Sequence, residues 1–275
     1  MPPGQIRHCS EVASGEAMSI YAISDLHLSL FTPKPMDIFG PAWEGHAEKI
    51  KRNWLETVSE SDTVLLPGDS SWAMRLHEAM PDLNFIADLP GSKVLIRGNH
   101  DYWWHRKQTS KIQREVDRNM TFLQGTSTMI GDIGITGTRG WRIDWETRRG
   151  EGAMGRGGDG ASGPEGDSAL TDYGLRITDH SSLITQRELT YLENGLKSIP
   201  SSAQLKIAML HFPPFDERLQ PNDFAHLLVR YSVDILVYGH VHLGLGNWLE
   251  GPVDGVNYHV ASADIIDFKP KLIVP

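Results

Sequence analysis

The chain has 275 residues and a formal net charge of -9 at pH 7. This acidity argues against a protein that coats long nucleic acid or an anionic membrane, because both need clustered Lys and Arg. Cys9 is the only cysteine, which excludes an internal disulfide and a cysteine-based zinc site. No apolar run reaches the roughly 18 residues of a membrane helix, and the N-terminus lacks the apolar core of a secretory signal. We therefore expect a cytoplasmic protein that has no membrane segment.

The first half of the chain alternates apolar runs with helical patterns. We expect residues 1–17 to be a disordered N-terminal extension and Met18 to begin the domain that continues to residue 275. The pattern predicts strands over 20–23, 63–66 and 93–97, and helices over 44–59 and 73–87. Strands that alternate with helices indicate right-handed crossovers and a largely parallel sheet. The polar motifs that follow these strands should then share one rim of the sheet.

The second half of the chain has shorter elements. Glycine-broken apolar runs over 121–138 indicate a second, β-rich layer, and the glycine-rich stretch at about 150–168 predicts a flexible surface insertion. This stretch contains Gly150-x-Gly152-x-x-Gly155, formally a dinucleotide fingerprint, but no strand precedes it and no apolar helix follows. Disorder therefore accounts for it better than a cofactor site. The remaining predicted elements are a helix over 182–196 and strands over 206–210, 234–238, 257–261 and 272–274.

Five short polar motifs, each after an apolar run, carry side chains that bind metals. They are Asp25-x-His27, Gly68-Asp69, Gly98-Asn99-His100-Asp101, His211 and Gly239-His240-x-His242. In an extended segment alternate side chains point to the same side, so the two residues of each x-spaced pair can converge. These pairs and the three single ligands Asp69, Asn99 and His211 make seven donors, more than one four-coordinate ion uses. Two ions are the economical explanation.

Asp69 suits the role of a bridge between two cations. Gly68 lets the backbone come close, and the two carboxylate oxygens of Asp69 can serve different metals. The mixture of carboxylate, amide and imidazole donors favours divalent or trivalent Mn, Fe, Co, Ni or Zn over Ca or Mg. Bound cations would add local positive charge, so an anionic substrate is compatible with the acidic chain.

The ordered set of five motifs resembles the calcineurin-like metallophosphoesterase superfamily over most of residues 18–273. The stretches 68–74, 100–104 and 137–141 also resemble a bacterial group of predicted phosphohydrolases within it. The resemblance implies an α/β fold of two packed β-sheets flanked by helices, a four-layer sandwich with a dinuclear site at the carboxyl ends of the strands. It implies that one metal takes Asp25, His27, Asp69 and His242, and that the other takes Asp69, Asn99, His211 and His240.

The activity that this resemblance implies is metal-dependent hydrolysis of a phosphoester by a hydroxide that bridges the two ions. His100 would protonate the leaving oxygen or stabilise the charged transition state, and Asp101 would fix the tautomer of His100. The expected substrate is a small phosphorylated molecule or a phosphodiester, and the monoester and diester interpretations both stay open. The alternative is a catalytically silent metal-binding scaffold of the same fold, which has no need of a proton donor.

Several other side chains near the motifs are candidates for substrate contacts. The aromatic residues could form a wall for an apolar or base-bearing leaving group, although core packing is the plainer explanation for each. They are Trp72, Tyr102, Trp103, Trp104 and Trp141, of which Trp72 and Trp104 are the stronger candidates. Arg139 could bind a substrate phosphate through its planar guanidinium, and a surface ion pair explains it equally well.

Overall fold

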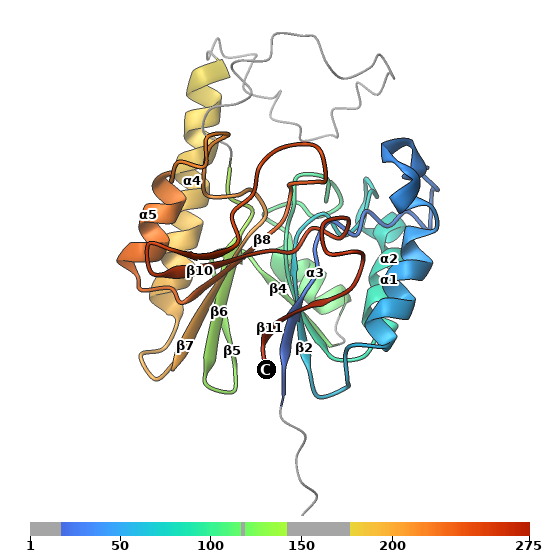
Figure 1. Cartoon of the computed structure of the whole chain (residues 1–275), viewed down its shortest axis with the longest axis horizontal. Helices are drawn as coiled ribbons and strands as arrows, with labels where there is room; N and C mark the ends of the chain where they lie inside the picture. Colours follow the sequence, from blue (N-terminus) through green and yellow to red (C-terminus); the bar gives the residue numbers. More distant parts are fainter. Residues whose placement is uncertain (1–17, 117–118, 142–176) are drawn as a thin grey trace, which may run out of the picture.

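The computed structural model describes residues 18–116, 119–141 and 177–275, and two β-sheets packed face to face form its centre (Figure 1). The expected N-terminal extension, residues 1–17, lies outside the described residues. So does the glycine-rich stretch at about 150–168 with its dinucleotide-like glycines.

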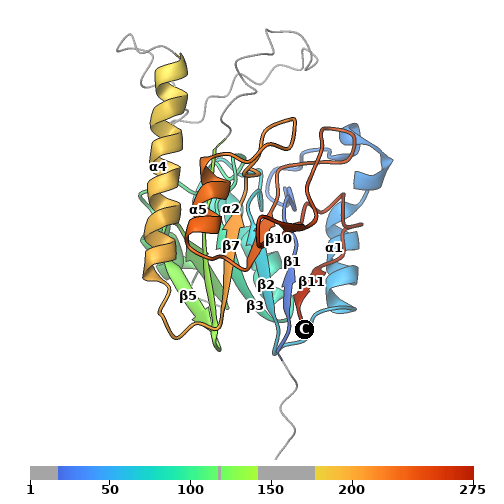
Figure 2. The same cartoon turned by 60° about the vertical axis from the view of Figure 1, so that its left-hand side comes forward.

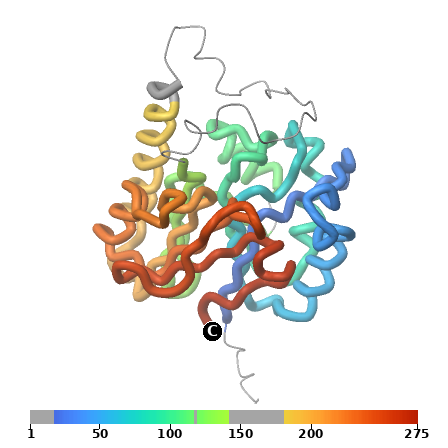
Figure 3. Tube along the Cα trace, turned by 45° about the horizontal axis from the view of Figure 1, so that its top comes forward, coloured from blue at the N-terminus to red at the C-terminus, as the bar shows by residue number. Residues whose placement is uncertain are grey.

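The first sheet has the strand order β11-β1-β2-β3-β4. Its strands are β1 (Ile20–Ala22), β2 (Thr63–Pro67), β3 (Ser92–Ile96), β4 (Met120–Leu123) and β11 (Lys271–Val274). Strands β1 to β4 run parallel, with Leu66 opposite Leu95, and β11 pairs antiparallel with β1 at the edge. Figure 3 shows this C-terminal strand beside the first strand of the chain. The parallel sheet predicted from the alternating pattern is confirmed.

The second sheet has the order β5-β6-β7-β8-β10-β9. Its strands are β5 (Ser127–Ile130), β6 (Ile133–Thr138), β7 (Leu205–Leu210), β8 (Ile235–Tyr238), β9 (Gly251–Val253) and β10 (Val256–Val260). Strands β6, β7, β8 and β10 are parallel, and β5 and β9 are antiparallel edges. The predicted second layer over 121–138 is divided, because β4 pairs with β3 in the first sheet. The chain changes sheets at Gly125, whose φ of 67° permits the turn.

Helices cover the outer face of each sheet, as Figures 1 and 2 show from two sides. The helices α1 (His46–Leu55), α2 (Leu76–Asp88) and α3 (Thr109–Glu115) lie against the first sheet, and α4 (Ile177–Ser198) and α5 (Asp223–Arg230) against the second. Two 3-10 turns, η1 (Asp37–Phe39) and η2 (Pro41–Trp43), precede α1. Of the helices described, none is long and apolar enough to cross a membrane.

Three apolar clusters hold the layers together. Between the two sheets, Ile20, Leu65 and Ile96 pack against Ile135, Met209 and other residues of the second sheet. A second cluster lies between the first sheet and α1 to α3, and a third between the second sheet and the helices α4 and α5. The order helix, sheet, sheet, helix is the four-layer sandwich that the family resemblance implies.

The two sheets are joined at the rim where their parallel strands end. Just past β1, the backbone N–H of Ser24 donates to the carbonyl of Ala261 at 2.7 Å, and Ala263 N–H donates to the carbonyl of Ser24 at 3.0 Å. Ala261 and Ala263 follow β10 in the other sheet. The carboxyl ends of strands from both sheets therefore converge on one place, and every polar motif follows one of these ends.

Candidate metal centre

The carboxylate of Asp25 lies just past the end of β1 and is fully buried. Its Oδ2 accepts hydrogen bonds from Ser24 Oγ at 2.5 Å, His240 N at 3.0 Å and Ser262 Oγ at 3.0 Å. Its Oδ1 has no hydrogen-bond partner among the described residues. A buried carboxylate oxygen is unfavourable unless a donor or a cation meets it. Oδ1 is therefore the atom that a metal ion would bind.

Two imidazoles face this bare oxygen. His27 Nε2 lies 3.9 Å from Asp25 Oδ1, and His242 Nε2 lies 3.8 Å from it. The other ring nitrogen of His242, Nδ1, lies 3.0 Å from Oδ1 of Asp264. A proton held on Nδ1 by that carboxylate leaves the Nε2 lone pair for a metal. The donor atoms of Asp25, His27 and His242 lie within 4.8 Å of one another.

Asp69, just past the end of β2, lies between two groups of ligands. Its Oδ1 accepts a hydrogen bond from the backbone N–H of His100 at 2.8 Å. Its Oδ2 lies 3.9 Å from His27 Nε2 and 3.4 Å from His211 Nε2. The sequence suggests one carboxylate oxygen for each metal, but the structure engages Oδ1 with the backbone. The single atom Oδ2 faces both histidines and is the one placed to bridge.

The second group of ligands gathers around Asn99, which follows β3. Its Oδ1 lies 2.6 Å from His211 Nε2 and 3.0 Å from His240 Nδ1. The Nδ1 atom of His211 donates to the carbonyl of Pro67 at 3.0 Å, so its Nε2 carries the lone pair. Two acceptor atoms as close as Asn99 Oδ1 and His211 Nε2 repel each other unless a cation or a proton lies beside them. The structure thus brings all seven predicted ligands to one place.

Four of these ligands have backbone in the left-handed region: Asp25 at φ 56°, His27 at 46°, Asp69 at 53° and His240 at 71°. This region costs about 1–2 kcal/mol for a residue with a side chain. The expectation that Asp25 and His27 converge from an extended segment is therefore wrong in its geometry, because the backbone of both residues is left-handed rather than extended. The backbone strain is therefore concentrated at residues whose side chains converge on the site.

The glycines of the motifs make room for the carboxylates. A Cβ atom on Gly98 would lie 2.0 Å from Asp69 Oδ1, and one on Gly239 would lie 2.6 Å from Asp25 Oδ2. Both distances are far below van der Waals contact, so any side chain at these positions would displace a ligand. Each glycine therefore leaves room for a carboxylate of another motif: Gly98 for Asp69, and Gly239 for Asp25.

The charges of the cluster fit a bound cation. Burial raises the pKa of Asp69 well above its usual range, and the neighbouring carboxylates of Asp25 and Asp101 raise it further. Burial also raises the pKa of Asp25. Burial lowers the pKa of His27 and His211 well below the usual value, which keeps both rings neutral. A transition-metal ion binds to a site of this kind, in which the buried carboxylates have no counter-charge and the imidazoles are neutral.

His100 is half-buried and lies beside the cluster. Its ring centroid is 5.6 Å from that of His27 and 4.3 Å from that of Trp72. Burial lowers the pKa of His100 to about 4, and the charges of His242 and Lys34 act in the same direction. The Nδ1 atom lies 3.2 Å from the hydroxyl of Tyr102. When that hydroxyl donates to Nδ1, the ring proton is on Nε2.

Asp101 is fully buried, and its carboxylate points away from the neighbouring imidazole. Its hydrogen-bond donors are the backbone N–H groups of Asp69, Ser70, Ser71 and Gly98 and the indole N–H of Trp103. No hydrogen bond joins it to the His100 ring among the described residues. Asp101 therefore holds the loop after β2 against the loop after β3, and Tyr102 is the residue that contacts the ring nitrogen of His100.

The candidates for substrate contacts lie in different places. Trp72 stacks on His27 at 4.9 Å between centroids, so it lines the cluster. Trp104 is fully buried, packs against Phe122 and lies in the helical core of the first sheet, away from the ligands. The guanidinium of Arg139 is 4.0 Å from Glu188 on α4, in a buried ion pair rather than the surface pair that the sequence suggests.

Several residues that build the site have no place in the sequence motifs: Ser24, Ser262, Asp264 and Tyr102. Ser262 and Asp264 follow β10, the strand that pairs with β8. The rule that polar residues after a parallel strand share one rim could have found both. Ser24 is a neighbour of a motif residue that no pattern separates from ordinary loop residues, whereas the sequence names Tyr102 only as an aromatic candidate for substrate contacts.

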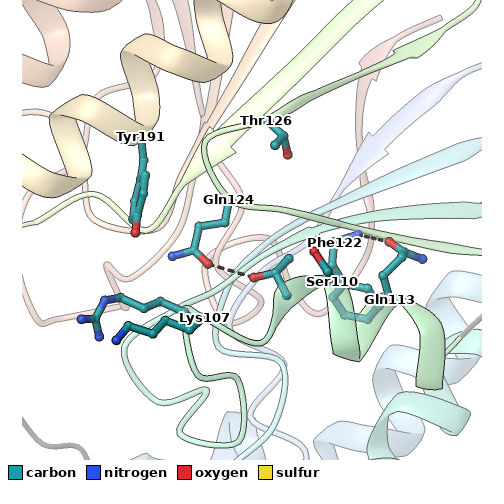
Figure 4. A pocket seen from close by; sticks show the side chains of 9 residues that line it. Lys107, Ser110, Gln113, Phe122, Gln124, Thr126 and Tyr191 are labelled. Atoms are coloured by element: carbon teal, nitrogen blue, oxygen red, sulfur yellow. Dashed lines mark hydrogen bonds between the residues drawn. The ribbon is translucent and has the colours of Figure 1, made fainter.

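A cavity of about 410 Å³ opens between α3, β4 and α4, as Figure 4 shows. Its lining is mostly polar and includes Arg106, Lys107, Gln124 and Tyr191. Gln124 accepts a hydrogen bond from Thr109. No predicted metal ligand lines this cavity, so it is separate from the site described above.

Residues 18–244 match the family model of the calcineurin-like phosphoesterases. No curated protein matches the chain. A protein of unknown function from Aquifex aeolicus is similar in structure, with 16% identity over 93% of this chain and 96% of that one and a TM-score of 0.43. The phosphopantetheinyl hydrolase of Mycobacterium tuberculosis has 16% identity over 94% of this chain and 96% of that one, with a TM-score of 0.54, which is a likeness of fold. The family match spans most of the sequence and all five motifs, and the chain belongs to the calcineurin-like phosphoesterase family.

Proposed function

We propose that this protein is a metal-dependent phosphohydrolase that cleaves a small phosphoester with two bound transition-metal ions. The observation that supports it most directly is the bare, buried Oδ1 of Asp25, which faces two imidazole nitrogens. One ion would be held by Asp25, His27, Asp69 and His242, and the other by Asp69, Asn99, His211 and His240. The family match and the donor types both favour this assignment.

When bound, two such ions lower the pKa of water and offset the negative charge of a phosphoryl group. The protein's own residues fix where this chemistry takes place. Asp264 keeps the Nε2 lone pair of His242 directed at the cluster, and the carbonyl of Pro67 does the same for His211. Asp101 fixes the distance between the loops that carry Asp69 and Asn99.

His100 is the residue that we propose acts on the substrate. With Tyr102 donating to Nδ1, the Nε2–H group of His100 is the donor that remains for an oxygen of the phosphoryl or leaving group. A hydrogen-bond donor at this place stabilises the negative charge that develops on that oxygen. Replacement of such a donor typically lowers kcat by about 10²–10³. Trp72 packs on both His100 and His27 and lines this side of the site.

The test combines metal analysis with a substrate screen. Purified protein is loaded with Mn, Fe, Co, Ni or Zn, its metal content is measured, and turnover is assayed on phosphomonoesters, phosphodiesters and nucleotides. We expect turnover that a chelator removes and that metal restores. Asp69→Asn, which lacks the carboxylate proposed to serve both ions, should lose both the bound metal and the turnover. Full metal content without turnover on any ester would instead support the alternative, a metal-binding scaffold.

Paired chromogenic substrates decide between the monoester and the diester. p-Nitrophenyl phosphate and bis(p-nitrophenyl) phosphate are compared with each metal, and a phosphopantetheinyl ester is added because the Mycobacterium structure carries that name. The net charge of -9 favours a small anionic substrate, which the ions attract locally, over a long nucleic acid.

A further inference from the structure

Lys34 lies in the loop that leads from β1 to η1, next to the wall of the candidate metal centre. Its Nζ atom is 4.7 Å from the centroid of the Trp72 ring. The same ring is 4.9 Å from the ring of His27 and 4.3 Å from that of His100. The ammonium group, a proposed ligand and the proposed donor therefore all contact one aromatic side chain.

The backbone around Lys34 is held in place. Pro33 and Pro35 flank it and restrict its conformation. Its N–H donates to the hydroxyl of Ser29 at 3.1 Å, and that hydroxyl lies 3.4 Å from the carbonyl of Lys34. Nearby, the N–H of Leu30 donates to the buried carboxylate of Asp82 on α2 at 2.8 Å. These contacts hold the loop that carries Lys34 together and join it to α2.

The charge of Lys34 has no acidic partner among the described residues, since no carboxylate lies within ion-pair distance of its ammonium group. The side chain is exposed, so a ligand in solvent can reach it. A lysine that rests on an indole ring loses part of its hydration and part of its rotational freedom before any ligand arrives. A compact ammonium group binds a phosphate as a point charge, without the strict geometry that a guanidinium requires.

We propose that Lys34 binds a second phosphate group of the substrate, carried on the leaving alcohol and distinct from the phosphate that is cleaved. This inference rests on the proposed function. The cleaved phosphate belongs at Asp25 and Asp69, whereas Lys34 contacts the Trp72 ring, which packs on His27 and His100. The indole ring between the two places offers an apolar surface for the carbon atoms of the leaving group. The substrate class is a small molecule with two phosphates on a short carbon chain.

The test uses a series of alkanediol bisphosphates, from ethane-1,2-diol to hexane-1,6-diol, each compared with its ω-hydroxyalkyl monophosphate. Release of phosphate is measured with the metal-loaded wild type, Lys34→Met and Lys34→Arg. We expect the wild type to prefer the bisphosphate at one chain length, by about fivefold in kcat/KM. Lys34→Met should remove this preference and Lys34→Arg should keep most of it. High salt should weaken the preference of the wild type.

A matched control separates this effect from a change in net charge. Lys197 is an exposed lysine on α4 that pairs with Glu193, and Lys197→Met should keep the wild-type preference. If Lys34→Met lowers kcat/KM equally for both members of each pair, or for neither, the inference is wrong. A fall in Tm of Lys34→Met with the preference retained would show that the lysine only supports the loop.

If the metal-loaded wild type turns over no ester, the proposed function itself is contradicted. In that case the role of Lys34 in binding a second phosphate is tested by calorimetric titration of propane-1,3-bisphosphonate and propylphosphonate into the same proteins. Tighter binding of the bisphosphonate by the wild type, lost in Lys34→Met, supports the second phosphate site. Equal binding of the bisphosphonate by the two proteins overturns it.

Discussion

The Nδ1 atom of His242 lies 3.0 Å from Oδ1 of Asp264, and this contact determines which ring nitrogen of His242 faces the metal ligands. The second oxygen of Asp264 accepts the backbone N–H of Leu243 at 3.1 Å, which fixes the carboxylate in turn. Burial alone would lower the pKa of His242, but the hydrogen bond to Asp264 and the charge of Asp25 raise it above the usual value. Asp264 thus makes the ring a stronger base and a better ligand.

Replacement of Asp264 should therefore weaken metal binding while the fold remains. We expect Asp264→Ala to lower the affinity for Mn²⁺ by about 10- to 100-fold, because the ring of His242 loses its orientation and part of its basicity. Asp264→Asn should have a smaller effect, since the amide oxygen can still accept the Nδ1 proton. Calorimetric titration measures the affinity, and circular dichroism checks the fold. The exposed Asp132, replaced by Ala, is the control; an Asp264→Ala affinity equal to that of this control contradicts the role.

Tyr102 should act on the reaction only through His100. Tyr102→Phe removes the hydroxyl that lies 3.2 Å from the Nδ1 atom of His100, so the imidazole loses its preferred tautomer. We expect kcat to fall several-fold and KM to change little. The decisive measurement is a double-mutant cycle: in a His100→Gln background, Tyr102→Phe should have no further effect on kcat. Additive losses would mean that the hydroxyl contacts the substrate itself.

The position of the ligands could be predicted from the sequence because parallel strands of a sheet end at one rim. The motif that ends at Asp69 follows β2 and the motif that begins at Gly98 follows β3, and a continuous apolar run marks each strand. The chemistry of the side chains then indicated a metal site. Strand order and donor type predict the ligands of the first sheet, whereas the family resemblance implied that those of the second sheet join them.

The contacts inside the site could not be predicted, because segments far apart in the chain determine them. Asp101 is next to His100 in sequence, yet its carboxylate turns toward the backbone of the Asp69 loop, where several N–H groups converge. The left-handed backbone of Asp25 likewise depends on hydrogen bonds to the loops after β8 and β10. The helix α5 has only eight residues, too few to show a helical period, and begins where Asn222 accepts the N–H of Phe224.

Metal removal should destabilise the wild-type protein more than a variant that lacks the bridging carboxylate. In the metal-free protein Asp69 is buried beside the carboxylates of Asp25 and Asp101, which repel it. A bound cation offsets this repulsion, so a chelator should lower the Tm of the wild type. Asp69→Asn keeps the acceptor for His100 N–H and removes the repulsion. We expect its metal-free Tm to equal or exceed that of the wild type and to change little when Mn²⁺ is added.

Differential scanning fluorimetry with and without Mn²⁺ measures both effects. Ala in place of Asp132 is again the control, because this exposed side chain lies outside the cluster, and its response to Mn²⁺ should match that of the wild type. A metal-dependent rise in Tm of the same size in Asp69→Asn and in the wild type would show that the ion is held without this carboxylate.

The pH dependence of folding should report on Asp62, at the start of β2. Its carboxylate accepts hydrogen bonds from Ser19 N at 2.9 Å, Ser59 N at 2.7 Å and Ser59 Oγ at 2.8 Å. Burial opposes ionisation, but these hydrogen bonds prevail and lower the pKa of Asp62 in the folded state. A carboxyl whose pKa is lower in the folded protein stabilises it fully above the unfolded pKa of about 3.9 and loses that effect as pH falls through the folded value.

The stabilising contribution of Asp62 should thus be present at neutral pH and disappear in acid. We expect Asp62→Asn to lower the urea midpoint relative to wild type at about pH 7, and the difference to shrink steadily toward about pH 3. Both proteins are compared in chelator, so that the buried carboxylates of the metal cluster, whose pKa values shift in the opposite direction, cancel in the difference. A difference that stays constant across this range would show that Asp62 supports the Ser59 turn by shape alone, because only an effect of its charge disappears when the carboxylate is protonated.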